Sequence, residues 1–104
     1  METHPKIRMD ILIEAPLRNR LSELLARHDV SGFTIFPAIG GQGGEGDWSR
    51  IGQITDMGQM LLFTCILDRS RASEMLEELY EDLADHIGYV TTTDVNVIRP
   101  NKFR

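Results

Sequence analysis

Cysteine is almost absent from this 104-residue chain, in which Cys65 is the single thiol. One cysteine cannot form an intrachain disulfide, so a disulfide-stapled secreted scaffold is excluded and a reducing compartment is favoured. Cys65 lies within an apolar run, where cysteine usually behaves as a small hydrophobic residue. We therefore expect Cys65 to be a core residue rather than a nucleophile.

Positive charge and long apolar runs are also scarce. The chain has 11 Lys and Arg and 16 Asp and Glu, which give a formal net charge of −5. This acidic balance excludes the broad basic surface that nucleic acids require, although a local anion site remains compatible with it. The longest apolar run, Met60 to Leu67, contains Thr64 and is too short to span a bilayer, and residues 1–6 form no apolar leader. We expect a cytoplasmic protein without direct membrane insertion.

Apolar periodicity predicts six elements. Alternation over residues 7–13 predicts a strand, and a 3.6-residue stripe after Pro16 predicts a helix, the stripe being Leu17, Leu21, Leu24, Leu25 and His28. Residues 33–39 predict a second strand, with Pro37 at an edge or an interruption of the ladder because proline has no amide donor. Residues 60–67, almost wholly apolar, predict a strand buried on both faces, which is either central in the sheet or covered by a subunit partner.

A second helical stripe and a last strand complete the pattern. The stripe consists of Ala72, Met75, Leu76, Leu79, Tyr80 and Leu83. Residues 89–98 carry threonine and valine and predict the last strand. The order β-α-β-β-α-β predicts a ferredoxin-like α+β fold over residues 1–104, a single domain whose four-stranded antiparallel sheet carries both helices on one face. The other face is left open, and we expect subunits to pack sheet to sheet there.

A glycine-rich loop separates the second and third strands. Residues 40–58 contain seven of the nine glycines of the chain, and because ordering glycine costs backbone entropy, a purely structural connection would use a shorter turn. The stretch from Gly40 to Gly44 follows a strand directly, so it is either a disordered linker or a cradle of amides for an anion. It lacks the lysine and threonine of a P-loop.

Two large side chains and three cations are the remaining candidates for binding. Trp48 and Arg50 lie in the loop, where we expect partner contact because an aromatic ring and a guanidinium are costly to expose without purpose. Arg99, Lys102 and Arg104 concentrate positive charge at the end of an acidic chain. Solvated tail charges are the simple interpretation, but in an oligomer these residues could serve a neighbouring subunit's phosphate site.

Three segments together resemble the PII signalling proteins. They are the start of the second strand at Gly32-Phe33-Thr34-Ile35, the glycine-rich exit at Gly40 to Gly44, and the end of the last strand at Val97-Ile98-Arg99. The resemblance covers nearly the whole chain. It implies a homotrimer that binds ATP or ADP in clefts between subunits and regulates an unidentified target protein through a flexible T-loop, here about residues 40–58.

The resemblance also implies roles for individual residues. It places three residues against the adenine, namely Gly32, Phe33 and Thr34. It assigns three loop-base residues to the phosphates, namely Gly40, Gly41 and Gln42. The turn His86-Ile87-Gly88 corresponds to the family's second glycine loop. Arg99 corresponds to the family's phosphate-binding arginine, and Lys102 or Arg104 would supply a second cation.

Departures from the PII pattern indicate a divergent, PII-like member. The turn at His86 is short and lacks the family's lysine-ending glycine sequence, which favours ADP or AMP over ATP. The loop has no tyrosine for uridylylation, and the glutamine that helps to bind 2-oxoglutarate corresponds most nearly to a displaced Gln42. The loop looks most like those of the carboxysome-associated and bicarbonate-transporter-associated PII-like proteins. That likeness implies a role in inorganic-carbon metabolism, with a transporter or a carbon-fixation component as target, and bicarbonate held by residues 41–44 (Gly41, Gln42, Gly43 and Gly44) and Arg50.

Three other classes of function compete with this interpretation. An enzyme is disfavoured because the histidines His4, His28 and His86 fall on separate predicted elements without a partner motif, so we expect no catalytic residue. A CutA-like trimeric metal-binding protein has the same fold, but no Cys and His spacing matches a ligand set, so we expect neither metal nor cofactor. A ligand-independent interaction module, in which the loop alone inserts into a partner, stays open.

Overall fold

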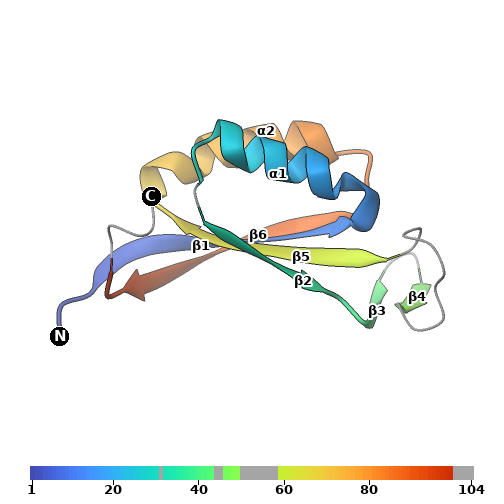
Figure 1. Cartoon of the computed structure of the whole chain (residues 1–104), viewed down its shortest axis with the longest axis horizontal. Coiled ribbons are helices and arrows are strands. Elements are labelled where there is room, and N and C mark those ends of the chain that lie inside the picture. The colour runs from blue at the N-terminus through green and yellow to red at the C-terminus, as the bar shows by residue number, and fades with distance from the viewer. Residues whose placement is uncertain (31, 44–45, 50–58, 100–104) are drawn as a thin grey trace.

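The computed structural model describes residues 1–30, 32–43, 46–49 and 59–99. Its main body is a four-stranded antiparallel sheet in the order β2-β5-β1-β6, with two helices on one face (Figure 1). The elements of this body are β1 (His4–Glu14), a 3-10 turn η1 (Ala15–Leu17), α1 (Arg18–Arg27), β2 (Phe33–Pro37), β5 (Met60–Leu67), α2 (Arg69–Leu83) and β6 (Gly88–Val97). The predicted ferredoxin-like fold is confirmed.

Several predicted boundaries shift for local reasons. Pro16 lies in η1 instead of the first turn of α1. Helix α2 begins at Arg69, three residues before the first residue of the predicted stripe, and only Asp68, in an extended conformation, separates it from β5. Strand β2 ends at Pro37 on the sheet edge, as the missing amide donor predicts. Ala38 lies beyond the strand, although its amide still donates to the Met60 carbonyl at 3.0 Å.

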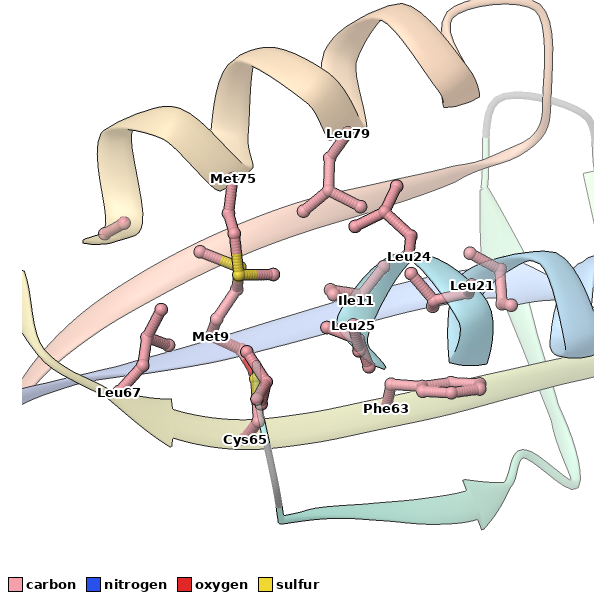
Figure 2. Close-up of a cluster of buried hydrophobic side chains, with 13 residues drawn as sticks. Met9, Ile11, Leu21, Leu24, Leu25, Phe63, Cys65, Leu67, Met75 and Leu79 are labelled. Carbon is pink, nitrogen blue, oxygen red and sulfur yellow. The ribbon is translucent and has the colours of Figure 1, made fainter. Parts of the chain in front are cut away.

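The core lies between the helices and the sheet (Figure 2). Alternate residues of β1 and β5 point toward the helices, and all are at most 4% exposed: Met9, Ile11, Ile13, Phe63, Cys65 and Leu67. Leu21, Leu24 and Leu25 of α1 and Met75 and Leu79 of α2 cover them. The prediction that Tyr80 belongs to the buried stripe of α2 is wrong. Its side chain is 77% exposed, because it lies at the margin of the stripe that Met75 and Leu79 define.

The face of the sheet opposite the helices is uncovered in the chain (Figure 1). Strand β5 is central in the sheet. Phe63, Cys65 and Leu67 on its helix side are buried, whereas on the other side Met60 is buried but Leu62, Thr64 and Ile66 are only half-buried. The register aligns one apolar residue from each strand across this face, in the order Phe36, Leu62, Leu12 and Tyr89. We call this set the apolar row. Phe36 is 50% and Tyr89 54% exposed.

Part of the glycine-rich loop forms a two-stranded hairpin that periodicity did not predict. Strands β3 (Gly40–Gly43) and β4 (Gly46–Ser49) pair antiparallel, with Gly41 opposite Trp48. The hairpin lies beyond the end of the sheet where β2 finishes and β5 begins (Figure 1). Glycine has no side chain to alternate, so a strand built from it shows no period-two signal.

Candidate functional site

A groove lies on the helix-free face of the sheet, at the end from which the hairpin projects. Its volume is about 600 Å³. Gly40, Gly41 and Gln42 of β3 reach it from one side and Gly88 of β6 from the other. The floor and remaining walls are Leu12, Phe36, Pro37, Ala38, Met60, Leu62, Ile87 and Tyr89. Four of the residues predicted to bind the nucleotide therefore share one groove, although they come from segments more than 40 positions apart.

Gly88 occupies a position that only glycine fits. Its φ is +143°, a conformation that residues with a side chain rarely adopt. A Cβ at this position would lie 2.0 Å from the Leu12 carbonyl oxygen. The close approach follows from the register, because Gly88 begins β6 opposite Ile13 of β1. Gly88 thus lets the turn that precedes β6 lie directly against β1.

The α2–β6 turn (residues 84–87) is held by a carboxylate from β1. The His86 amide donates to the Leu83 carbonyl at 3.0 Å as α2 ends. The Ile87 amide donates to Glu14 Oε1 at 2.9 Å, and His86 Nδ1 lies 3.9 Å from the same oxygen. The turn therefore has a defined conformation beside the groove.

A second pocket lies on the other side of this turn. It has a volume of about 390 Å³ and is mainly apolar, with Leu76, Leu79 and Leu83 of α2 on one side and Val90 of β6 on the other. Tyr80 and Tyr89 stand at its margin and are largely exposed. Leu12, Ile87, Gly88 and Tyr89 line both this pocket and the groove, so the start of β6, together with Leu12 of β1, separates the two.

The predicted adenine contacts lie nearer the middle of the sheet, level with Met9 of β1 and Thr92 of β6. Phe33 begins β2 and pairs with Cys65, and its ring stacks on Phe63 with centroids 5.5 Å apart, so it is packed against the core. Thr34 is exposed on the helix-free face, and Gly32 is exposed just before the strand. None of these three residues lines the groove.

Arg99 is likewise remote from the groove. It is exposed and follows the end of β6, whereas Gly88 begins that strand and Val97 ends it, pairing with His4. At about 3.3 Å per residue, the ends of β6 are roughly 30 Å apart. Within one chain, Arg99 and the groove therefore cannot contact the same nucleotide.

Other predicted binding residues fall wholly or partly outside what the structure describes. Gly44, Arg50, Lys102 and Arg104 lie outside the described residues. For Gly43 and Trp48 only the backbone is described: Gly43 pairs with Gly46 and Trp48 with Gly41. The predictions of bicarbonate contact and partner contact for these residues stay predictions.

Cys65 is buried, as predicted, with Sγ 3.9 Å from the Met9 carbonyl oxygen. Burial, and secondarily the charge of Asp10, raise the pKa of its thiol to about 11, so it is a poor nucleophile at neutral pH. Within the described ranges, no three His, Cys, Asp or Glu side chains gather as a metal site.

Sequence reasoning missed the apolar walls of the groove and the role of Glu14. Phe36 and Tyr89 could have been found from the sequence. In the period-two alternation of their strands, both fall on the face that is not buried in the core, where large apolar side chains are unexpected. Glu14 had none, because its contact with Ile87 joins positions 73 residues apart and depends on the pairing of β1 with β6.

The fold is that of a PII-type protein. The family model described as nitrogen regulatory protein P-II matches residues 6–102. The chain therefore belongs to the P-II family, and its structural neighbours show it to be a divergent, PII-like member.

Solved structures of PII-like proteins superpose over nearly the whole chain. CPII of Thiomonas intermedia, bound to ADP, AMP and bicarbonate, matches with a TM-score of 0.91 at 24% identity, covering 99% of this chain and 97% of its own. A second CPII structure, bound to ADP and bicarbonate, gives 0.87 at 26% identity, with coverage of 99% and 98%. A PII-like signalling protein of Thermus thermophilus gives 0.85 at 27% identity, with full coverage of both chains.

No curated protein matches the chain. In the part of the chain that the structure describes, neither helix has the length and apolarity needed to cross a membrane.

Proposed function

We propose that this protein is a non-catalytic, cytoplasmic PII-like regulator that binds an adenine nucleotide in clefts between the subunits of a homotrimer. ADP and AMP are its preferred ligands, ahead of ATP. Bicarbonate binds at the base of the T-loop (residues 40–58), and the loop contacts a target protein through Trp48 and Arg50. The target belongs to inorganic-carbon metabolism, as a transporter or a carbon-fixation component.

The placement of the predicted binding residues carries this proposal. The loop base and Gly88 share a groove at one end of the sheet, and Arg99 follows the opposite end of β6. Gly32, Phe33 and Thr34 lie between them, toward the middle of the sheet. One nucleotide cannot bridge both ends of one chain, but two neighbouring subunits can bring the groove of one beside the opposite end of the next. A site divided in this way is complete only in the oligomer.

The helix-free face supports the trimer. The apolar row crosses all four strands and is partly exposed in the chain. Such contiguous apolar surface usually marks an interface. A closed ring of subunits that buries this face would leave both helices and the hairpin on the outside (Figure 1).

The relatives support the choice of ligands. CPII has been solved with ADP, AMP and bicarbonate, and with ADP and bicarbonate. In this chain, the amides of Gly40 and Gly41 lie beside the groove without side chains to obstruct an anion. Regulation of the target requires that ligand binding favour one conformation of the T-loop over another, because only a difference in affinity shifts a population.

Calorimetric titration with AMP, ADP and ATP, each with and without bicarbonate at constant ionic strength, tests the proposal. We expect AMP and ADP to bind more tightly than ATP, and bicarbonate to strengthen binding. The variant Arg99→Ala should weaken nucleotide binding at least about tenfold, the usual scale for a charged hydrogen bond to phosphate. Arg18→Ala, which removes an exposed cation from α1, is the matched control and should leave the affinity unchanged.

The absence of binding heat and of thermal stabilisation with all three nucleotides would overturn the proposal. In that event, nucleotide-independent capture of a partner through the loop, or stabilisation by divalent metal ions, would become the better account.

A further inference from the structure

The α2–β6 turn already holds an anion, and that anion belongs to the chain. The Ile87 amide donates to Glu14 Oε1 at 2.9 Å, and His86 Nδ1 is 3.9 Å from the same oxygen. The Glu14 side chain is 33% exposed, so water and solutes reach it. It comes from the end of β1, whose pairing with β6 places Ile13 opposite Gly88.

This carboxylate stands beside the place where the proposed function requires phosphate. Backbone amides in glycine-containing turns are anion-binding groups, and a carboxylate oxygen satisfies such an amide as a phosphate oxygen would. Ile87 and Gly88 line the groove that Gly40, Gly41 and Gln42 enter. Glu14 itself does not line the groove, but its carboxylate accepts from the amide of Ile87, which does, so its negative charge lies within hydrogen-bond distance of the groove wall.

We propose that Glu14 is a specificity residue of the nucleotide site. It holds the turn through the Ile87 amide and repels nucleotides in proportion to their phosphate charge. The inference rests on the proposed function and supplies a physical reason, within this chain, for a preference for AMP and ADP. Because like-charge repulsion scales with ligand charge, the penalty is largest for ATP and smallest for AMP.

The test is a titration of the full-length protein and its Glu14→Gln variant with AMP, ADP and ATP at fixed ionic strength. Glutamine keeps an oxygen that accepts from the Ile87 amide and removes only the charge. We expect ATP to bind about tenfold more tightly to the variant, because one like charge at a partly exposed site is removed. AMP, with about half the charge of ATP, should gain only about threefold. Glu74→Gln, on the exposed side of α2, removes the same charge elsewhere and should change none of the three affinities.

A second variant separates charge from turn geometry. Glu14→Ala removes both the charge and the acceptor, and it should also raise the affinity for ATP relative to that for AMP. If Glu14 had only a structural role, loss of the turn would weaken all three nucleotides by the same factor. An ATP-to-AMP affinity ratio equal to that of the wild type in both variants would overturn the inference while leaving the proposed function intact. Failure of the wild type itself to bind any nucleotide would instead overturn both.

Discussion

At the scale of single residues, two glycines that the family resemblance treats alike are physically different. Gly88 has positive φ, and a Cβ there would meet the backbone of Leu12. Gly32 has no heavy atom within 4 Å of its Cβ position. Gly88 is therefore required by the fold itself, whereas nothing in the fold demands glycine at position 32.

Gly88→Ala should destabilise the protein by about 3 kcal/mol. The alanine would be strained at positive φ, and its Cβ would clash with the Leu12 carbonyl oxygen, which is held in place by the backbone of β1. Gly32→Ala should change the unfolding free energy by less than about 1 kcal/mol, in either direction. Urea denaturation of the two variants measures the difference. Equal stability would show that the turn at Gly88 relaxes freely.

These residues also show where sequence reasoning reaches its limit. The alternation of Ile7, Met9 and Ile11 predicts a buried strand face because the signal is local and periodic. The importance of Gly88 is visible as a turn residue, but its contact with Leu12 is not, since this depends on how β6 aligns with β1. Glu14 is equally hidden, because a carboxylate at a strand end looks like any solvated charge.

At the scale of elements, the two helices are joined by polar contacts as well as by the core. His28 caps the C-terminal end of α1 and its Nε2 contacts Glu78 Oε2 of α2, while Arg27 Nη2 lies 3.1 Å from the other oxygen of Glu78. The His28 side chain is 14% exposed. We call Arg27, His28 and Glu78 the interhelix clamp. His28, which the sequence placed in an apolar stripe, is therefore a polar link between the helices.

The interhelix clamp makes stability depend on pH. The hydrogen bond from His28, followed by the charges of His28 and Arg27, lowers the pKa of Glu78 from its ordinary value of 4.5. A carboxylate whose pKa is lower in the folded state stabilises the fold above the unfolded pKa and loses this contribution as pH falls through the folded one. Glu78→Gln should therefore lower the urea midpoint at pH 7, and the difference from wild type should shrink below about pH 4.5.

Glu77→Gln is the matched control for the interhelix clamp, since Glu77 is the exposed neighbour on the same helix. Its urea midpoint should follow that of the wild type at every pH. A Glu78→Gln deficit of the same size at pH 7 and pH 3 would show that the loss comes from packing and not from charge.

The hairpin illustrates what element-level prediction cannot reach. The predicted strand over residues 60–67 coincides with β5, because a buried strand requires a run of apolar side chains that is visible in the sequence. Strands β3 and β4 are built mostly from glycine and polar residues, so their pairing leaves no comparable pattern. Their position beside the groove follows from the end of β2 at Pro37 and the start of β5 at Met60.

At the scale of the whole molecule, the proposed nucleotide site depends on the proposed trimer, because the two share residues. The groove lies on the same uncovered face as the apolar row, and Leu12, Phe36, Leu62 and Tyr89 belong to both. Subunits that pack on this face would therefore form the walls of the groove directly. Nucleotide binding and oligomerisation should be thermodynamically linked.

Leu62→Glu should convert the proposed trimer to a monomer, because burying an unpaired carboxylate in an apolar interface costs several kcal/mol. Light scattering should give three times the chain mass of 11.8 kDa for the wild type and the single-chain mass for the variant. Nucleotide binding should be lost in the same variant. Ser73→Glu, an equivalent change on the exposed side of α2, should leave the trimer intact; a monomeric wild type would contradict the assembly.

The burial of Cys65 bears on what this molecule can sense. Peroxides and disulfides react with thiolates, and a thiol with a pKa of about 11 is ionised in only about one molecule in ten thousand at pH 7. The sulfur is also enclosed between the sheet and the helices (Figure 2). With its one thiol buried and protonated, the protein has no reactive cysteine through which it could respond to the oxidation state of its surroundings.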